Sequence, residues 1–264
     1  MEQRIPNYNE ARLRIKKARD FFEKENISIN PFTLSNKQFE DLREKVFDFS
    51  KNLAGEFSQS SLNPNIDGLE KHLLTMEEVF SWLFEFDEFK NLLPIQARDN
   101  FNFLRFLVLA HDFERFIFNG PFPLNYIDQV GDALNERVFF PGFDFSPFLH
   151  RMDYITGRKK APSSDDFPLV YIFKAVDSLA KPGRDPKLFL EREYDQWLEQ
   201  QIQRKRFPIR IRNFEGKIIE VLADEYREKD IAMIRQGVDI ISRITNLSSY
   251  QVFDKIREVN FSFD

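Results

Sequence analysis

The chain has 264 residues, of which 42% are hydrophobic and 15% aromatic, so it can bury the core of one large domain or two small ones. It contains no cysteine, which excludes disulfides and thiolate metal sites. Its net charge of −5 argues against broad, charge-driven binding of nucleic acid. Because neither a signal peptide nor a long apolar run is visible, we expect a cytoplasmic protein that does not enter the membrane.

The first half of the chain shows the apolar spacing of helices. Amphipathic helices are predicted at residues 8–26 and 36–56, with the breaker Ile29-Asn30-Pro31-Phe32 between them. Two further helices follow, the second of which is the most apolar in the chain; they span residues 69–84 and 100–116.

The middle of the chain is rich in breakers. Residues 119–147 contain several glycines and prolines, so we expect mostly loop around one short helix near residues 126–138. Ser146 followed by Pro147 is typical of a helix start, and Gly157 closes that short helix.

The last third is again mostly helical. An apolar helix is predicted at residues 169–180 and a charged one at about 187–205. Alternating apolar and polar residues around Asn213-Phe214-Glu215-Gly216 then predict a β-hairpin, and helices at about 223–244 and 248–258 finish the chain. The expected fold class is therefore all-α with one small β-hairpin.

Two polar residues occupy apolar helix faces. His72 lies between Leu69 and Met76 on the apolar stripe of its helix. A single histidine in such a place is more often a hydrogen-bonded core residue than a metal ligand. Asp177 lies on the stripe that contains Phe173 and Ala180, and a buried carboxylate needs an arginine, a lysine, backbone donors or a metal ion.

A metal site follows from combining these residues with the dipeptide His111-Asp112, which ends another apolar helix. Two neutral imidazoles and two carboxylates form a suitable site for one divalent ion, and Mn, Mg, Fe, Co, Ni and Zn all remain candidates. Adjacent helical residues diverge by about 100°, so His111 and Asp112 can bind one ion only if it lies near the helix end.

The order and spacing of His72, His111-Asp112 and Asp177 resemble the HD superfamily of metal-dependent phosphohydrolases. The resemblance covers roughly residues 65–182, through the segments LEKHLLTMEEVFSWLF, FLRFLVLAHDFERF and LVYIFKAVDSLAKP. It implies an N-terminal helical extension at residues 1–62, an HD-type metal-binding core at 63–184 and a C-terminal addition at 185–264. Phe113-Glu114 replaces a glycine that is frequent in the family, and the absence of an adjacent histidine pair before Asp177 favours one metal over two.

The activity that the resemblance implies is hydrolysis of a nucleotide or another small phosphoester by metal-activated water. Asp112 would be a ligand that also orients this water, and Glu114 would be the general base; the alternative for Glu114 is a solvated acid paired with Arg115. The candidate contacts to substrate are basic, namely Arg115, His150, Lys174 and Lys181, with Arg151, Arg158, Lys159 and Lys160 as further cations. His150 is equally compatible with a hydrogen bond to Asp153. A non-catalytic HD-fold protein, regulatory or interacting with a partner, remains the alternative.

The hairpin region is expected to serve assembly. Arg204-Lys205-Arg206 together with Arg210 and Arg212 suits an anionic partner or a nucleic acid, although a solvated helix end and a charged edge strand explain the same residues and nucleic acid is disfavoured by the net charge. Because two strands alone are only marginally stable, Ile209 and Ile211 should be covered by the terminal helices or by a second subunit, and a homodimer is the preferred assembly.

Overall fold

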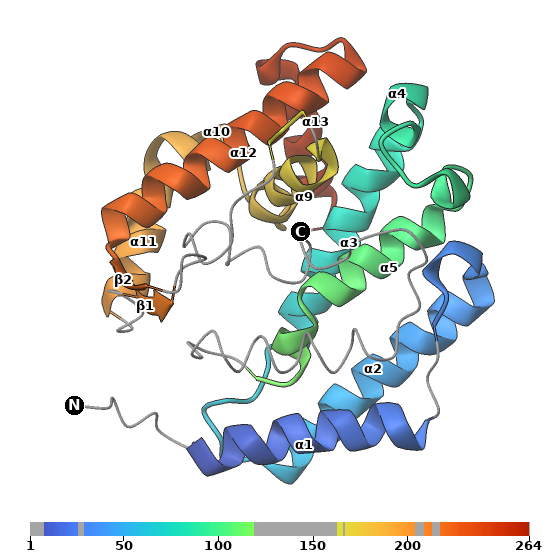
Figure 1. The fold of residues 1–264 in the computed structure, drawn as a ribbon, viewed down its shortest axis with the longest axis vertical. Helices are drawn as coiled ribbons and strands as arrows, with labels where there is room; N and C mark the ends of the chain where they lie inside the picture. The colour runs from blue at the N-terminus through green and yellow to red at the C-terminus, as the bar shows by residue number, and fades with distance from the viewer. Residues whose placement is uncertain are drawn as a thin grey trace. The chain divides into compact units, whose positions relative to one another are not determined.

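The computed structural model describes residues 8–25, 29–118, 163–165, 167–203, 209–212 and 217–263. In this part of the chain the secondary structure is helical apart from an isolated bridge residue and one two-stranded antiparallel sheet (Figure 1). The predicted all-α class with a small β-hairpin is confirmed. The helices expected near residues 126–138 and 147–157 lie outside the described residues.

Two compact units make up the chain. The first comprises the described residues within 1–70 and 102–145, and the second those within 71–101 and 146–264. This grouping differs from the three consecutive ranges that the resemblance implies, because the contacts of a folded chain join segments that are distant in sequence. The three-part division therefore stays a prediction.

Unit 1 is built from helices of the N-terminal region and from the helix that carries His111. A capping box starts α2, since the Ser35 hydroxyl accepts from Gln38 N at 3.3 Å and the Gln38 side chain accepts from Ser35 N at 2.9 Å. The elements are α1 (Tyr8–Lys24), η1 (Pro31–Thr33), α2 (Asn36–Glu56), the first residues of α3 (Ile66–Leu83), most of α5 (Phe101–His111) and η3 (Phe113–Phe116).

The core of unit 1 anchors the backbone that follows Asp112. Phe113 and Phe116 of η3 pack against Phe22 and Phe47, with ring centroids 5.0 Å apart in both pairs. Side chains of α1 and α2 bind the carbonyls beyond: Arg14 Nη1 donates to Ile117 O at 2.9 Å, and Ser50 Oγ donates to Phe116 O at 2.7 Å. These contacts fix where the chain leaves α5.

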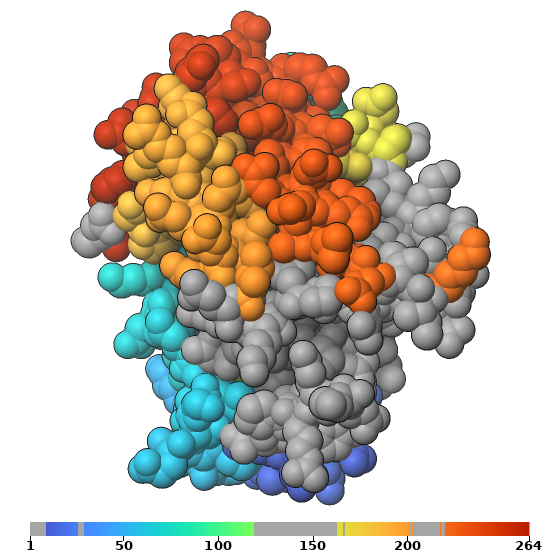
Figure 2. Space-filling view, turned by 90° about the vertical axis from the view of Figure 1, so that its left-hand side faces the viewer, coloured from blue at the N-terminus to red at the C-terminus, as the bar shows by residue number. Residues whose placement is uncertain are grey.

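Unit 2 contains the helices that carry His72 and Asp177, together with the hairpin. Its elements are the rest of α3, α4 (Asp87–Lys90), η2 (Ile95–Ala97), α9 (Pro168–Leu179), α10 (Pro186–Leu188), the π-helical turn η4 (Phe189–Glu193), α11 (Tyr194–Gln203), β1 (Ile209–Arg212), β2 (Ile218–Val221), α12 (Ala223–Thr245) and α13 (Ser249–Ser262). Figure 2 shows α11 and α12 side by side at the surface, where Arg227 Nη2 donates to Asp195 Oδ2 at 3.0 Å.

The centre of unit 2 is α9, which is buried at every position from Leu169 to Leu179. Helix α12 packs along it (Figure 1). A glycine permits this approach: a Cβ at Gly237 would lie 2.1 Å from Tyr171 O and 2.7 Å from Ala175 Cβ. Since these separations are far below van der Waals contact, only glycine fits between the two helices.

The predicted hairpin is present as the antiparallel pair β1 and β2. Ile209 lies opposite Val221 and Arg212 opposite Ile218, and Val221 is buried. The turn at residues 213–216, the cluster Arg204-Lys205-Arg206 and the side chains of Arg210 and Arg212 lie outside the described part of the structure.

The helix boundaries differ from expectation most clearly at the His-Asp dipeptide. A helix was expected over residues 100–116, but α5 ends at His111, Asp112 has φ −113° and ψ 21°, and the chain continues as the 3₁₀ turn η3. At the C-terminus α13 runs to Ser262, beyond the expected end at residue 258. None of the helices described combines the length and the apolar character needed to cross a membrane.

Candidate metal centre

His72 is held by the end of α9. The side chain is buried on α3, and its Nδ1 lies 3.0 Å from the backbone oxygen of Ala180. A carbonyl oxygen can only accept a hydrogen bond, so Nδ1 carries a hydrogen. The other ring nitrogen, Nε2, lies 3.2 Å from Asp177 Oδ1. The fixed Nδ1–H therefore directs Nε2 at a carboxylate oxygen.

Asp177 lies in the last turn of α9 and is 6% exposed. The guanidinium of Arg184 lies near Asp177 and contributes positive charge. Burial lowers the pKa of Arg184 to about 10, and the charge of Asp177 opposes this decrease. Arg184 therefore stays protonated at neutral pH and offsets part of the cost of burying the carboxylate.

His111 repeats the arrangement of His72. Its Nδ1 lies 2.5 Å from Val108 O, one turn earlier in α5, and its Nε2 lies 3.4 Å from Asp112 Oδ2. Arg115 Nη1 lies 3.1 Å from the same carboxylate oxygen. The end of the α-helix at His111 makes this geometry possible, because side chains of adjacent residues within a helix would diverge.

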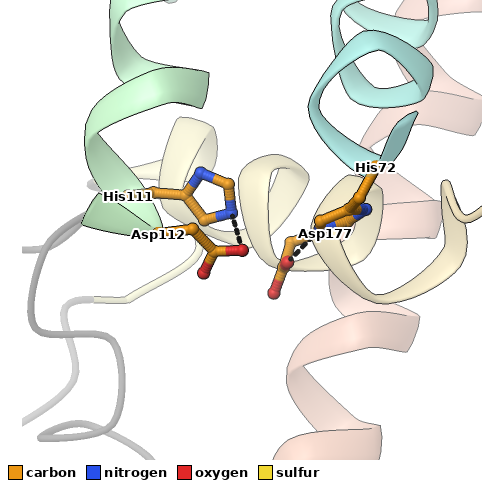
Figure 3. A group of neighbouring side chains, drawn as sticks. All are labelled: His72, His111, Asp112 and Asp177. Carbon is orange, nitrogen blue, oxygen red and sulfur yellow. Dashed lines mark hydrogen bonds and ion pairs between the residues drawn. The ribbon is translucent and has the colours of Figure 1, made fainter. Parts of the chain in front are cut away.

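The four side chains form one group. One ligand atom from each of His72, His111, Asp112 and Asp177 lies within 4.8 Å of those of the other three, and all four residues are buried (Figure 3). Two nitrogens and two carboxylates are a suitable donor set for a transition metal or Mg²⁺.

The orientation of both imidazoles also suits a metal. Histidine ligands usually donate their second ring N–H to a carbonyl or carboxylate, which fixes the tautomer and aims the free nitrogen at the ion. Both His72 and His111 donate Nδ1–H to a backbone carbonyl in this way. The residues present therefore fit a divalent cation.

The other predicted site residues differ in burial, and several of them lie outside the described residues. Glu114 is half-buried in η3. The Arg115 side chain is 48% exposed and forms an ion pair with Asp112. Lys181 is half-buried in the turn after α9. His150, Arg151, Arg158, Lys159 and Lys160 lie outside the described residues.

Lys174, expected to contact substrate, has a structural partner. Its Nζ lies 2.7 Å from Asp230 Oδ1, and Tyr194 donates its hydroxyl hydrogen to Asp230 Oδ2 at 2.6 Å. Burial raises the pKa of Tyr194, and Asp230 raises it further, so the hydroxyl remains a donor. The ammonium group of Lys174 is thus bound to a carboxylate of its own unit.

Two residues near the site escaped the sequence reasoning. Arg184 follows Pro182-Gly183 in a segment without periodicity, and nothing there indicates a partner on α9. Asn260 has a recognisable signal: it continues the buried stripe of Val252, Ile256 and Val259 on α13. A polar residue on such a stripe requires a hydrogen-bond partner.

No family model, curated protein or solved structure gives a significant match to this chain. The resemblance to the HD superfamily therefore rests on the four residues and their helices.

Proposed function

We propose that the protein is a metal-dependent phosphohydrolase of the HD type, acting on a nucleotide or another small phosphoester, in the cytoplasm. His72, His111, Asp112 and Asp177 would hold one divalent ion. The observation that supports this proposal most is the pair of buried imidazoles whose Nδ1–H groups are bound to carbonyls and whose Nε2 atoms are directed at carboxylate oxygens.

Electrostatics explains why this arrangement favours a positive charge between each ring and its carboxylate, supplied either by a second proton on the ring or by a metal ion. In a neutral ring, Nε2 presents a lone pair to a carboxylate oxygen, and the two repel each other in a buried site. One divalent ion would neutralise both carboxylates and accept both lone pairs. The position of Asp177 at the C-terminal turn of α9 adds the partial negative charge of a helix end, which also favours a cation.

The chemistry can be assigned to residues of the chain. A divalent ion supplies an activated water and polarises a phosphoryl oxygen. Asp112 and Asp177 would supply the negative charge that holds the ion, and Glu114, two residues after Asp112, would accept a proton as the general base. Arg115, half exposed beside Asp112, presents a guanidinium for an anionic phosphate oxygen.

A non-catalytic role is the second candidate. The pairing of Lys174 with Asp230 favours it, because that pair removes one of the cations that the phosphohydrolase would use for phosphate. In this case the ion would stabilise the fold or respond to a ligand without turnover.

The test combines metal loading with turnover. Chelator-treated protein is titrated with Mn²⁺, Mg²⁺, Fe²⁺, Co²⁺, Ni²⁺ and Zn²⁺ and assayed on nucleotides and on bis-p-nitrophenyl phosphate. We expect hydrolysis with at least one ion, and a loss of more than 100-fold in Asp112→Ala with unchanged circular dichroism. Asp239→Ala, an exposed acid on α12, serves as the control and should keep full activity.

Each result decides between the candidates. Equal activity in Asp112→Ala and in the control would refute the assignment of hydrolysis to this site. Metal-dependent stabilisation without turnover on any substrate would favour the non-catalytic protein, and the absence of any metal binding would refute both.

A further inference from the structure

The end of α9 is capped by side chains from distant parts of unit 2. A helix leaves its last carbonyls without partners inside the helix. Here three consecutive carbonyls each accept from a different side chain: Ser178 O from Arg184 Nη1 at 2.6 Å, Leu179 O from Asn260 Nδ2 at 2.8 Å and Ala180 O from His72 Nδ1 at 3.0 Å. The third of these bonds orients a proposed metal ligand.

Asn260 makes three hydrogen bonds to this segment. It is fully buried in α13, and Nδ2 donates a second hydrogen bond to Arg184 O at 2.7 Å. Its backbone oxygen accepts from Gly183 N at 3.0 Å. Gly183 has φ 69°, a conformation natural to glycine, and lets the chain turn back towards Asn260. One residue of the C-terminal helix thus binds both ends of the segment from Leu179 to Arg184.

We infer that Asn260 is a positioning residue for the metal site. Its amide donates to the backbone oxygens of Leu179 and Arg184 and acts on His72 through the backbone between them. By fixing Leu179 O and Arg184 O, it fixes the intervening Ala180 carbonyl, which selects the Nδ1–H tautomer of His72 and directs Nε2 at Asp177. The C-terminal helix is therefore a support of the site. The effect on metal affinity rests on the proposed function, whereas the effect on the His72 ring does not.

Burial argues that the support is specific. Leu179 is fully buried, so water does not reach its carbonyl to replace the Asn260 amide. Without Asn260, this oxygen keeps its bond from Lys181 N at 3.1 Å but loses its connection to α13. Mutation of a residue that hydrogen-bonds a metal ligand directly typically changes metal affinity by about 10- to 100-fold, so we expect an effect near the lower end for Asn260, which acts through a backbone carbonyl. A purely structural asparagine would change stability alone.

The experiment observes His72 directly. The chain has three histidines, so protein labelled with ¹⁵N-histidine gives few ring signals, and His72→Gln assigns the one that matters. Asn260→Leu removes the amide at similar size, and Asn260→Ser retains a single donor in case the leucine variant does not fold. Thr245→Val is the matched control, because it removes another buried side-chain bond, Thr245 Oγ1 to Ile241 O at 2.8 Å.

In metal-free protein we expect the ring ¹⁵N shifts of His72 to leave the Nδ1–H pattern in Asn260→Leu, and partly in Asn260→Ser. The Kd for Mn²⁺ should rise at least tenfold in the leucine variant and less in the serine variant. Thr245→Val should leave both quantities at wild-type values while lowering the melting temperature.

Wild-type His72 signals in a folded Asn260 variant overturn the inference, even if Mn²⁺ affinity falls. Equal losses in Thr245→Val also overturn it, because the effect is then one of general stability. If the wild-type protein binds no divalent ion but the His72 signals change in the Asn260 variants, the proposed function fails and the positioning role of Asn260 is supported.

Discussion

At the scale of single residues, buried charges in the described structure are balanced by specific partners. Lys174 and Asp230 are the clearest case: their side chains are 10% and 3% exposed, and the carboxylate also accepts from Tyr194. Removing one member of such a pair leaves an uncompensated buried charge, whereas replacing both with apolar groups is often close to neutral. Replacing both residues therefore allows a role of Lys174 in catalysis to be measured without the loss of stability that a single replacement causes.

We predict that Asp230→Ala lowers the free energy of unfolding by about 3–5 kcal/mol, since it leaves the Lys174 ammonium buried alone. The double variant Lys174→Met, Asp230→Leu should recover most of this loss in urea denaturation. Hydrolysis by the double variant then tests the substrate role of Lys174. A raised KM at wild-type stability would support a phosphate contact, and unchanged kinetics would show that the lysine is structural.

At the scale of elements, α9 connects packing with the site. It carries Asp177, offers its terminal carbonyls to His72, Arg184 and Asn260, and lies against α12 at Gly237. Because protein interiors are close-packed, a displacement of α12 at one end of this contact is transmitted to α9.

We predict that Gly237→Ala lowers the free energy of unfolding by about 1–3 kcal/mol, since the added methyl group overlaps the fixed backbone at Tyr171 O. Gly55→Ala in α2 is the matched control. Nothing lies within 4 Å of a Cβ at Gly55, so alanine should stabilise the helix by about 0.5–1 kcal/mol. The close approach of α12 to α9 would be contradicted if the denaturation midpoints of the two variants change equally. It would also be contradicted if Gly237→Ala raises the midpoint and Gly55→Ala lowers it.

At the scale of the whole molecule, the hairpin carries the prediction about assembly. Val221 of β2 is buried within the chain itself, so part of the hairpin is covered without a second subunit. The expected dimer interface would therefore involve Ile209 and Ile211, whose side chains are not among those that the structure describes.

We predict that the full chain is a dimer in solution and that deletion of residues 207–222 yields a soluble monomer, because two strands need further apolar surface to be stable. Light scattering gives the mass, and circular dichroism monitors the helices. Substitution of Ile209 and Ile211 with serine is the milder companion variant, since it keeps Val221 in place. If both variants remain dimers, this interface is excluded.

The sequence by itself predicted most of the described helices, the hairpin and the four residues proposed as metal ligands. Apolar periodicity and local caps such as Ser35 and Ser248 act within one or two turns, so the helices and the hairpin could be predicted from neighbouring residues. The four proposed ligands stood out for the same reason, as polar side chains on or beside apolar stripes.

Only the tertiary structure decided how those residues are held. The end of α5 at His111 depends on Phe113 and Phe116 packing on other helices, which outweighs the local tendency to continue a helix. The side chains that donate to Ala180 O and Leu179 O are 108 and 81 residues away in sequence, and Lys174 is bound to a carboxylate on α12. Local patterns contain no information about such pairings, because they are selected by which buried acceptors the packed helices bring together.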